Sequence, residues 1–289
     1  MYADDFDLVI DEINTRPFMT PRFVKTKPIL ALIHQLAREY WFYETPWPIS
    51  WLGYYYLENA WLKSYRDLMT LTVSESTRRD LQMLGFTNVQ IVPEAISVET
   101  CNSIPAKETN PTLLFVGRLK RAKKPEHAVW AFDNVRRDVK NAKLWIVGDG
   151  YMKPRLEAIA GDGVVLTGRV SEETKVGLMS HAHVLLFPAV REGWGLSITE
   201  AGARGTPVVA YDVPGVRDAV MDGKTGLLVR ADDWESMASQ ASKLLKDERL
   251  REAMALNAIE FARGLSWDRT ETLFSQRCLQ ALNLRDFEG

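Results

Sequence analysis

The sequence predicts an α/β protein whose second half folds as a Rossmann-like, doubly wound parallel sheet. Six short apolar runs lie between residues 112 and 231, and each is bounded by Gly or Pro. Segments of helical length alternate with these runs, as expected for parallel strands that are covered by helices on both faces. A hydrophobic content of 46% with 26% charged residues is typical of a globular protein with a sizeable core.

The elements of the second half follow from this alternation. We expect a parallel sheet to bind its ligand beyond the carboxyl ends of its strands, in the loops that lead into the helices. From 233 to 286 the pattern is helical only. The expected strands are 112–117, 143–148, 163–168, 183–188, 207–212 and 226–231, and the expected helices are 125–138, 151–160, 171–181 and 196–204.

The first hundred residues repeat the theme less completely, and a polar connector at 100–111 separates them from the second half. A helix is expected over 74–84, because Ser74 is a suitable N-cap and Gly85 a suitable C-terminal stop. The expected strands of this part are 6–10, 29–34, 68–73 and 89–92.

Charge and hydropathy narrow the classes of function. The net charge of −2 and the dispersed Lys and Arg residues give no reason to expect a nucleic-acid partner. The acidic N-terminus does not resemble a signal peptide, and no apolar run approaches bilayer length, so we expect a cytoplasmic protein. Cys101 and Cys278 form no metal-spaced pair and favour a reducing compartment.

A basic pair follows the first strand of the second half. In "VGRLKRAKKPEHAV" the strand ends at Gly117, and Arg118 and Lys123 precede a helix that Pro125 can open. Arginine offers a bidentate fork and lysine a compact charge, so the pair is suited to a diphosphate. A solvated basic loop is the alternative interpretation of these residues.

Two glutamates eight positions apart frame a glycine loop in "REGWGLSITEAGARGTPVVA". The N–H groups of Gly193, Gly195 and Leu196 are expected at a helix N-terminus, where they form an anion site. Glu200 then lies about one turn inside that helix, within reach of a ribose or sugar hydroxyl pair, and Glu192 lies in the preceding loop. Alternatively, Glu192 stabilises the helix dipole and Glu200 is a surface residue.

Three other motifs give weaker indications of function. Gly148 and Gly150 give half of a dinucleotide fingerprint, but Lys153 stands where its third glycine belongs, so NAD is disfavoured. The His181-x-His183 pair lacks a third metal ligand. His34 ends a predicted strand, where it either faces a cleft or has a structural role.

These motifs together resemble the family 4 retaining glycosyltransferases of the GT-B fold, densely over 112–230 and loosely over 1–100. The resemblance implies that a nucleotide-diphosphate sugar donates its sugar to an unknown saccharide, lipid-linked or protein acceptor, with retention and without a metal or other cofactor. Arg118 and Lys123 would hold the diphosphate, Glu192 the sugar hydroxyls, and Glu200 the ribose. The implied catalytic residues are His34, Glu192, Arg118 and Lys123, and the implied donor-binding residues are Gly117, Gly168, Arg169, Gly193, Trp194, Gly195, Leu196 and Glu200.

The resemblance also implies a domain layout. A partial acceptor-side domain is expected over 1–104, a nucleotide-sugar domain over 105–265, and a helix at 266–289 that packs back on the first domain. The strand and glycine-rich loop that usually open the family's N-terminal domain have no counterpart here, so a truncated N-terminal domain is expected. The chain is then either an enzyme or an incomplete donor-binding subunit that needs a further segment or partner.

The segment 40–65 is dense in aromatic residues, with four of the nine tryptophans and six of the nine tyrosines. One interpretation is an interfacial patch that contacts a membrane or a lipid-linked acceptor peripherally. The other is a face that packs against a further part of the N-terminal domain and self-associates when exposed.

Overall fold

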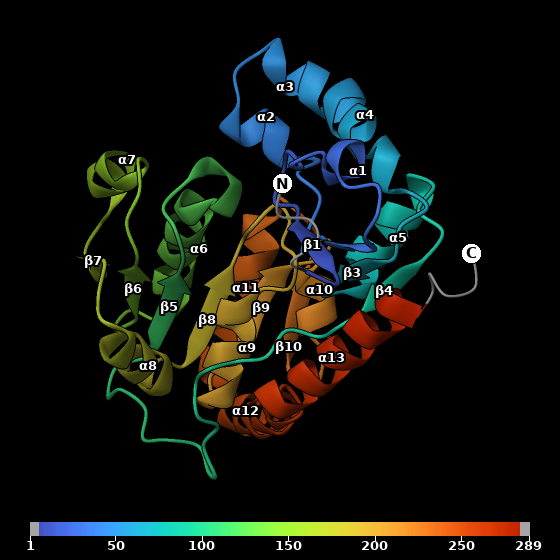
Figure 1. The fold of residues 1–289 in the computed structure, drawn as a ribbon. Helices are drawn as coiled ribbons and strands as arrows, with labels where there is room; N and C mark the ends of the chain where they lie inside the picture. Colours follow the sequence, from blue (N-terminus) through green and yellow to red (C-terminus); the bar gives the residue numbers. More distant parts are fainter. Residues whose placement is uncertain (1–5, 284–289) are drawn as a thin grey trace. The chain divides into compact units, whose positions relative to one another are not determined.

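The computed structural model describes residues 6–283 (Figure 1). The first five residues of the acidic N-terminus and the last residues of the predicted helical segment, 284–289, lie outside the described part. The chain divides into two compact units. One contains the described residues up to Ala95 together with those from Leu265 on, and the other spans Ile96–Gly264. None of the described helices is both long and apolar enough to cross a bilayer.

The first unit contains a parallel sheet in the order β1-β2-β3-β4, and all four predicted strands are present. Alternate residues of β2 enter different apolar clusters: Ala31 packs with Leu62 and Tyr65, whereas Leu30 packs with the C-terminal helix α13. Ser74 caps α5 as expected, by accepting a hydrogen bond from the Thr77 N–H. The elements are β1 Val9–Glu12, α1 Thr20–Phe23, β2 Ile29–Leu32, β3 Thr70–Thr72, α5 Glu75–Met83, β4 Val89–Ile91 and α13 Trp267–Asn283.

The aromatic segment folds as a series of short helical pieces. Tyr65 is fully buried, and Gly53 lets the ring of Trp41 approach, since a Cβ at Gly53 would lie 2.2 Å from that ring. Trp47 and Tyr56 of the same segment are exposed. Membrane contact and self-association through this face stay predictions. The pieces are α2 Tyr40–Glu44, α3 Ile49–Leu52, the π-helix η2 Gly53–Leu57, α4 Glu58–Leu62 and the 3-10 helix η3 Lys63–Tyr65.

The second unit is a six-stranded parallel sheet in the order β10-β9-β8-β5-β6-β7. All six predicted strands and all four predicted helices between them are present, with ends that differ by a few residues from the prediction. The strands are β5 Thr112–Val116, β6 Lys143–Val147, β7 Val164–Gly168, β8 Val184–Phe187, β9 Val208–Tyr211 and β10 Gly226–Val229. The helical elements are η4 Arg121–Lys123, α6 Pro125–Asp138, α7 Lys153–Ile159, α8 Glu172–His181, α9 Leu196–Ala203, α10 Val216–Ala219, α11 Trp234–Lys246 and α12 Glu248–Arg263.

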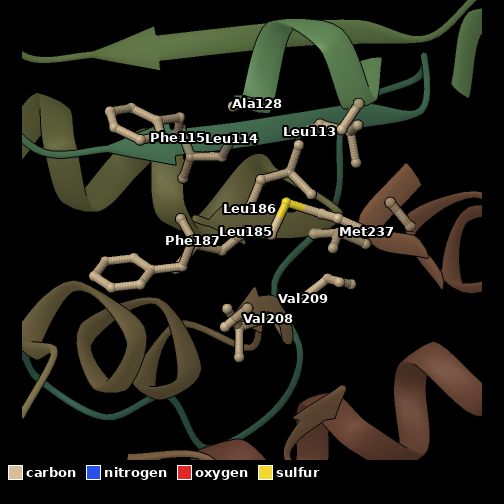
Figure 2. Close-up of a cluster of buried hydrophobic side chains, with 14 of the residues drawn as sticks. Leu113, Leu114, Phe115, Ala128, Leu185, Leu186, Phe187, Val208, Val209 and Met237 are labelled. Carbon is tan, nitrogen blue, oxygen red and sulfur yellow. The ribbon is translucent and has the colours of Figure 1, made fainter. Parts of the chain in front are cut away.

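The core of the second unit lies around its central strands. Figure 2 shows side chains of β5, β8 and β9 gathered together with Met237 of α11. Every residue of these three strands is buried, which explains why the sequence shows continuous apolar runs there instead of alternation. Helix α6 contacts α11, and α9 contacts α8 and α12.

Candidate active site

The strand order of the second unit places a topological switch point between β5 and β8. The chain runs from β5 outward to β6 and β7, then returns to β8 and continues the other way to β9 and β10. In open parallel sheets, ligands bind at such a point, outside the carboxyl ends of the strands. The loop after β5 carries Arg118 and Lys123, and the loop after β8 carries Glu192. The topology therefore brings the two predicted motifs together.

The glycines of the half fingerprint have a packing role in this arrangement. A Cβ at Gly148 would lie 2.0 Å from the Gly117 carbonyl oxygen, and a Cβ at Gly150 would lie 2.4 Å from that of Leu119. Backbone hydrogen bonds join the same two loops, from the Gly117 N–H to Val147 and from the Leu119 N–H to Asp149. These glycines let the loop after β6 lie directly against the basic loop, which accounts for them without a dinucleotide.

The two basic residues differ in their environments. Arg118 is exposed, and its guanidinium makes no hydrogen bond or ion pair within residues 6–283. Lys123 is only 17% exposed, forms an ion pair with Glu192, and lies over the ring of Phe187 at 5.6 Å. The predicted diphosphate pair therefore consists of one available guanidinium and one lysine whose charge is balanced by a carboxylate.

Glu192 is held by backbone contacts as well as by Lys123. Its N–H donates to the Pro214 carbonyl at 3.0 Å, and a Cβ at Gly215 would lie 2.0 Å from the Glu192 carbonyl oxygen. The next residue but one, Trp194, stacks on Phe261 of α12 with ring centroids 6.5 Å apart. Sequence reasoning did not assign a role to Gly215 or Phe261. Both fix the glycine loop that carries the predicted sugar contacts.

Helix α9 begins where the sequence predicts, one residue after Gly195, whose φ of 105° is a conformation that favours glycine. Gly193 is half-buried and Leu196 is exposed in the first turn. Glu200 lies one turn further along the helix and is only 14% exposed. The predicted alternative, a solvated surface glutamate, is therefore wrong for Glu200.

Glu200 has a partner that sequence reasoning missed. The ammonium of Lys175, on α8, lies 3.1 Å and 3.3 Å from its two carboxylate oxygens. Burial raises the pKa of Glu200, and the charge and hydrogen bonds of Lys175 oppose that shift. Nothing in the sequence around Lys175 distinguishes it from an ordinary helix-surface lysine, because its partner is 25 residues away on another helix.

The remaining predicted donor contacts lie at the end of β7. Gly168 has a φ of 70°, and its carbonyl accepts a hydrogen bond from the Gly148 N–H at 3.0 Å. Arg169 follows it and is exposed. Gly168 is thus joined to the same loop that packs against Gly117, which connects three strand ends by backbone contacts.

His34 belongs to the first unit, two residues after the end of β2. Its Nδ1 lies 2.8 Å from a carboxylate oxygen of Glu94, and its Nε2 lies 3.8 Å from one of Glu12. The hydrogen bond to Glu94 is the largest cause that raises the pKa of His34. His34 therefore presents a partly exposed imidazole near the carboxyl end of its strand, and the Glu94 carboxylate orients this ring.

The two histidines of the His181-x-His183 pair, in the second unit, contact backbone groups. His183 is buried, and its Nδ1 accepts a hydrogen bond from the Thr112 N–H at 3.0 Å. The His181 ring contacts the Ala106 carbonyl at 3.0 Å. Over residues 6–283, no three His, Cys, Asp or Glu side chains are grouped as metal ligands.

Comparison with known proteins decides the family. A profile of the family described as "Glycosyl transferases group 1" matches residues 99–261, which is more than half of the chain. The chain belongs to the group 1 glycosyltransferases. The match covers every predicted site residue of the second unit, from Gly117 to Glu200.

Bacterial glycosyltransferases are similar to this chain in sequence. It is 34% identical to the alpha-D-kanosaminyltransferase of Streptomyces kanamyceticus over 52% of this chain and 40% of that protein. It is 31% identical to the phosphatidyl-myo-inositol mannosyltransferase of Mycobacterium leprae over 68% of this chain and 55% of that protein. The chain thus spans roughly half the length of these curated relatives.

Solved structures share the glycosyltransferase's fold. Sucrose-phosphate synthase from Thermosynechococcus elongatus superposes with a TM-score of 0.76 at 19% identity, over 97% of this chain and 75% of that one. Anabaena HepE in complex with UDP and glucose gives a TM-score of 0.73 at 14% identity, over 95% and 78% of the chains. The predicted fold class, GT-B with Rossmann-like parallel sheets, is confirmed.

Proposed function

We propose that this glycosyltransferase uses a nucleotide-diphosphate sugar and transfers the sugar with retention of the anomeric configuration, as a family 4 enzyme. The observation that supports this most is the convergence at the switch point of an available guanidinium, a lysine–glutamate pair and a helix N-terminus. Cations and N–H groups suit a diphosphate, and buried carboxylates suit hydroxyl groups. Two solved structures similar to this chain, HepE and a mutant of Staphylococcus aureus TarM, are complexes with UDP, which fits the same donor class.

In this proposal each residue has one role. Arg118 and Lys123 bind the diphosphate, and the N–H groups around Gly195 add to its stabilisation. Glu192 accepts hydrogen bonds from the sugar hydroxyls, and Glu200 accepts them from the ribose. The main chain at Gly117, Gly168 and Arg169 borders the nucleotide, Gly193, Trp194 and Leu196 complete the glycine loop, and His34 faces the sugar.

The proposed transfer step depends on the charge that develops on the leaving diphosphate. The bond between the anomeric carbon and the β-phosphate oxygen breaks, and the acceptor oxygen forms a new bond to that carbon. Negative charge grows on the departing diphosphate, where Arg118 and Lys123 stabilise it without a resident metal. In a same-face reaction the acceptor proton moves to a phosphate oxygen of the leaving group, so no protein base is required. Glu192 remains a hydroxyl ligand throughout.

Ligand binding tests the donor class. A panel of nucleoside diphosphates and NAD is tested at one fixed concentration, and a ligand present at 100 times its dissociation constant stabilises the protein by about 2.7 kcal/mol. We expect a thermal shift with one nucleoside diphosphate and none with NAD. Glu200→Ala should weaken binding of that nucleotide by about ten- to a hundredfold, because two charge-assisted hydrogen bonds are lost. Unchanged calorimetric affinity in Glu200→Ala contradicts the ribose assignment.

Stereochemistry is testable without knowing the acceptor. Water can replace the acceptor in slow hydrolysis of the sugar nucleotide, and proton NMR at early times identifies the first anomer released. An α-linked donor should release the α-sugar before mutarotation. Release of the β-sugar, or a glycosyl adduct on a protein side chain in mass spectra, overturns the proposed mechanism. Addition of EDTA should leave the rate unchanged.

A further inference from the structure

Lys175 connects the donor helix to its neighbour. It lies on α8, is 17% exposed, and its ammonium reaches three carboxylate oxygens. Two belong to Glu200, at 3.1 Å and 3.3 Å, and the third to Glu172, at 2.7 Å. An ammonium has three donors, so these contacts use its full capacity. The two carboxylates differ, because Glu200 is 14% exposed whereas Glu172 is 83% exposed.

The burial of Glu200 makes its partner important. Desolvation disfavours the charged form of a carboxyl and raises the pKa of Glu200, and the nearby charge of Glu172 adds to that shift. Lys175 is the group that opposes both effects. Burial lowers the pKa of Lys175, but the hydrogen bonds and charges of Glu172 and Glu200 outweigh this effect and raise the pKa, so Lys175 remains an ammonium.

Lys175 also leaves Glu200 able to bind a ligand. Each carboxylate oxygen accepts more than one hydrogen bond, so contact with the ammonium does not exhaust either oxygen. Both oxygens contact one ammonium from α8, which restrains the carboxylate and leaves each oxygen with further lone pairs. A carboxylate held in this way can accept two neighbouring hydroxyl groups without first losing conformational freedom.

We propose that Lys175 is a positioning residue of the donor site, which keeps the Glu200 carboxylate charged and aimed for the hydroxyl pair of the donor ribose. The inference rests on the proposed function, since it requires that Glu200 binds ribose. Glu172 is an exposed second partner of Lys175 and is not required for the role.

The test compares three substitutions by titration calorimetry with the nucleoside diphosphate that stabilises the wild-type protein. Lys175→Met keeps the length of the side chain without its charge, Lys175→Arg keeps the charge, and Glu172→Gln removes only the exposed partner. At pH 7 we expect Lys175→Met to weaken affinity about tenfold, Lys175→Arg to recover most of it, and Glu172→Gln to change it by less than about twofold.

The pH dependence separates positioning from a general structural effect. Without Lys175 the pKa of Glu200 should rise further, so the affinity ratio of wild type to Lys175→Met should grow as the pH falls from 8 to 6. In a Glu200→Gln background, Lys175→Met should have little further effect on affinity. A pH-independent ratio, or equal losses in both backgrounds, overturns the inference even if Lys175→Met is less stable.

The two proposals fail in different ways. If the wild-type protein binds no nucleoside diphosphate, the proposed function is wrong and the inference falls with it. If the wild-type protein binds one and Glu200→Gln weakens it, but Lys175→Met does not, the proposed function stands and the role of Lys175 is wrong. Loss of affinity in Lys175→Met without rescue by Lys175→Arg also contradicts the proposal.

Discussion

The contact between Gly215 and Glu192 predicts a substitution that should damage the site from outside it. Gly215 has a φ of 81°, and an added Cβ would lie 2.0 Å from the Glu192 carbonyl oxygen and 3.0 Å from the carbonyl carbon of Gly193. Since real Cβ atoms stay at least 3.0 Å from such atoms, Gly215→Ala must move one of the two loops by about 1 Å. The glycine loop that carries the predicted sugar contacts is one of them.

The magnitude follows from two contributions. A left-handed alanine costs about 1 kcal/mol, and overpacking against a fixed backbone costs about 2 kcal/mol more. Gly223 offers a matched control, because its φ is 72° and an added Cβ would meet nothing within 4 Å. Gly223→Ala should therefore lose only about 1 kcal/mol of unfolding free energy, and Gly215→Ala about 3 kcal/mol.

Two measurements check this reasoning. Urea unfolding followed by fluorescence should show the difference of about 2 kcal/mol between the two variants. Sugar transfer or donor hydrolysis should fall by about a hundredfold in Gly215→Ala, since an error of 1 Å at a reacting centre has about that effect. Gly223→Ala should keep wild-type activity. Equal stability losses and unchanged activity in both variants would refute the proposed role of the contact.

Three further predictions concern charged groups. Arg118→Ala should leave the unfolding free energy unchanged and weaken diphosphate binding by about tenfold. Lys123→Ala should weaken binding too and also lower the unfolding free energy by about 1 to 3 kcal/mol, because Glu192 then stays buried without its partner. Urea unfolding measures the stability of the two variants, and calorimetry measures their affinity. Glu192→Ala should lower transfer at saturating donor more than it weakens nucleotide affinity, and an equal loss in both would contradict its assignment to the sugar. Glu94→Gln should lower the pKa of His34, as measured by NMR titration. Because the pKa of His34 is raised in the folded state, its protonation stabilises the fold below about pH 6.5, and this stabilisation is lost as the pH rises through the folded pKa. Glu94→Gln should therefore flatten this pH dependence of stability.

Much of the fold was predictable because each strand of the second unit is encoded by a short apolar run in the sequence itself. The runs that became β5, β8 and β9 are continuously apolar, and their full burial between helices requires that pattern. Strand order was not predicted, since nothing local in a parallel strand specifies its neighbour. The pairing of β5 with β8 nevertheless defines the candidate site, because it brings the loop that carries Arg118 and Lys123 to the loop that carries Glu192.

The aromatic segment shows where prediction from sequence stops. Its composition left open an interfacial patch and a face that packs against a further part of the N-terminal domain, and the structure shows buried side chains such as Tyr65 beside exposed ones such as Trp47. Glu58 is buried there and accepts hydrogen bonds from the N–H groups of Ala37 and Arg38, at 2.5 Å and 3.1 Å. A buried carboxylate that satisfies two backbone donors of a turn has no sequence pattern, because its partners are about twenty residues away. The close approach of the Trp41 ring to Gly53 likewise joins positions twelve residues apart.

The two glutamates show the same limit at the site itself. Glu192 and Glu200 are eight residues apart in one motif, yet each is paired with a lysine from a different element. Lys123 comes from η4 and Lys175 from α8, and they lie 69 and 25 residues away from their partners. Each pair keeps a poorly solvated carboxylate beside a compensating charge. A carboxylate that binds neutral hydroxyl groups should stay charged, and one that faces a diphosphate should not add repulsion. If Glu192 and Glu200 bind the donor as proposed, a neighbouring lysine meets both requirements, and substitution of either lysine should weaken donor binding as substitution of its glutamate does.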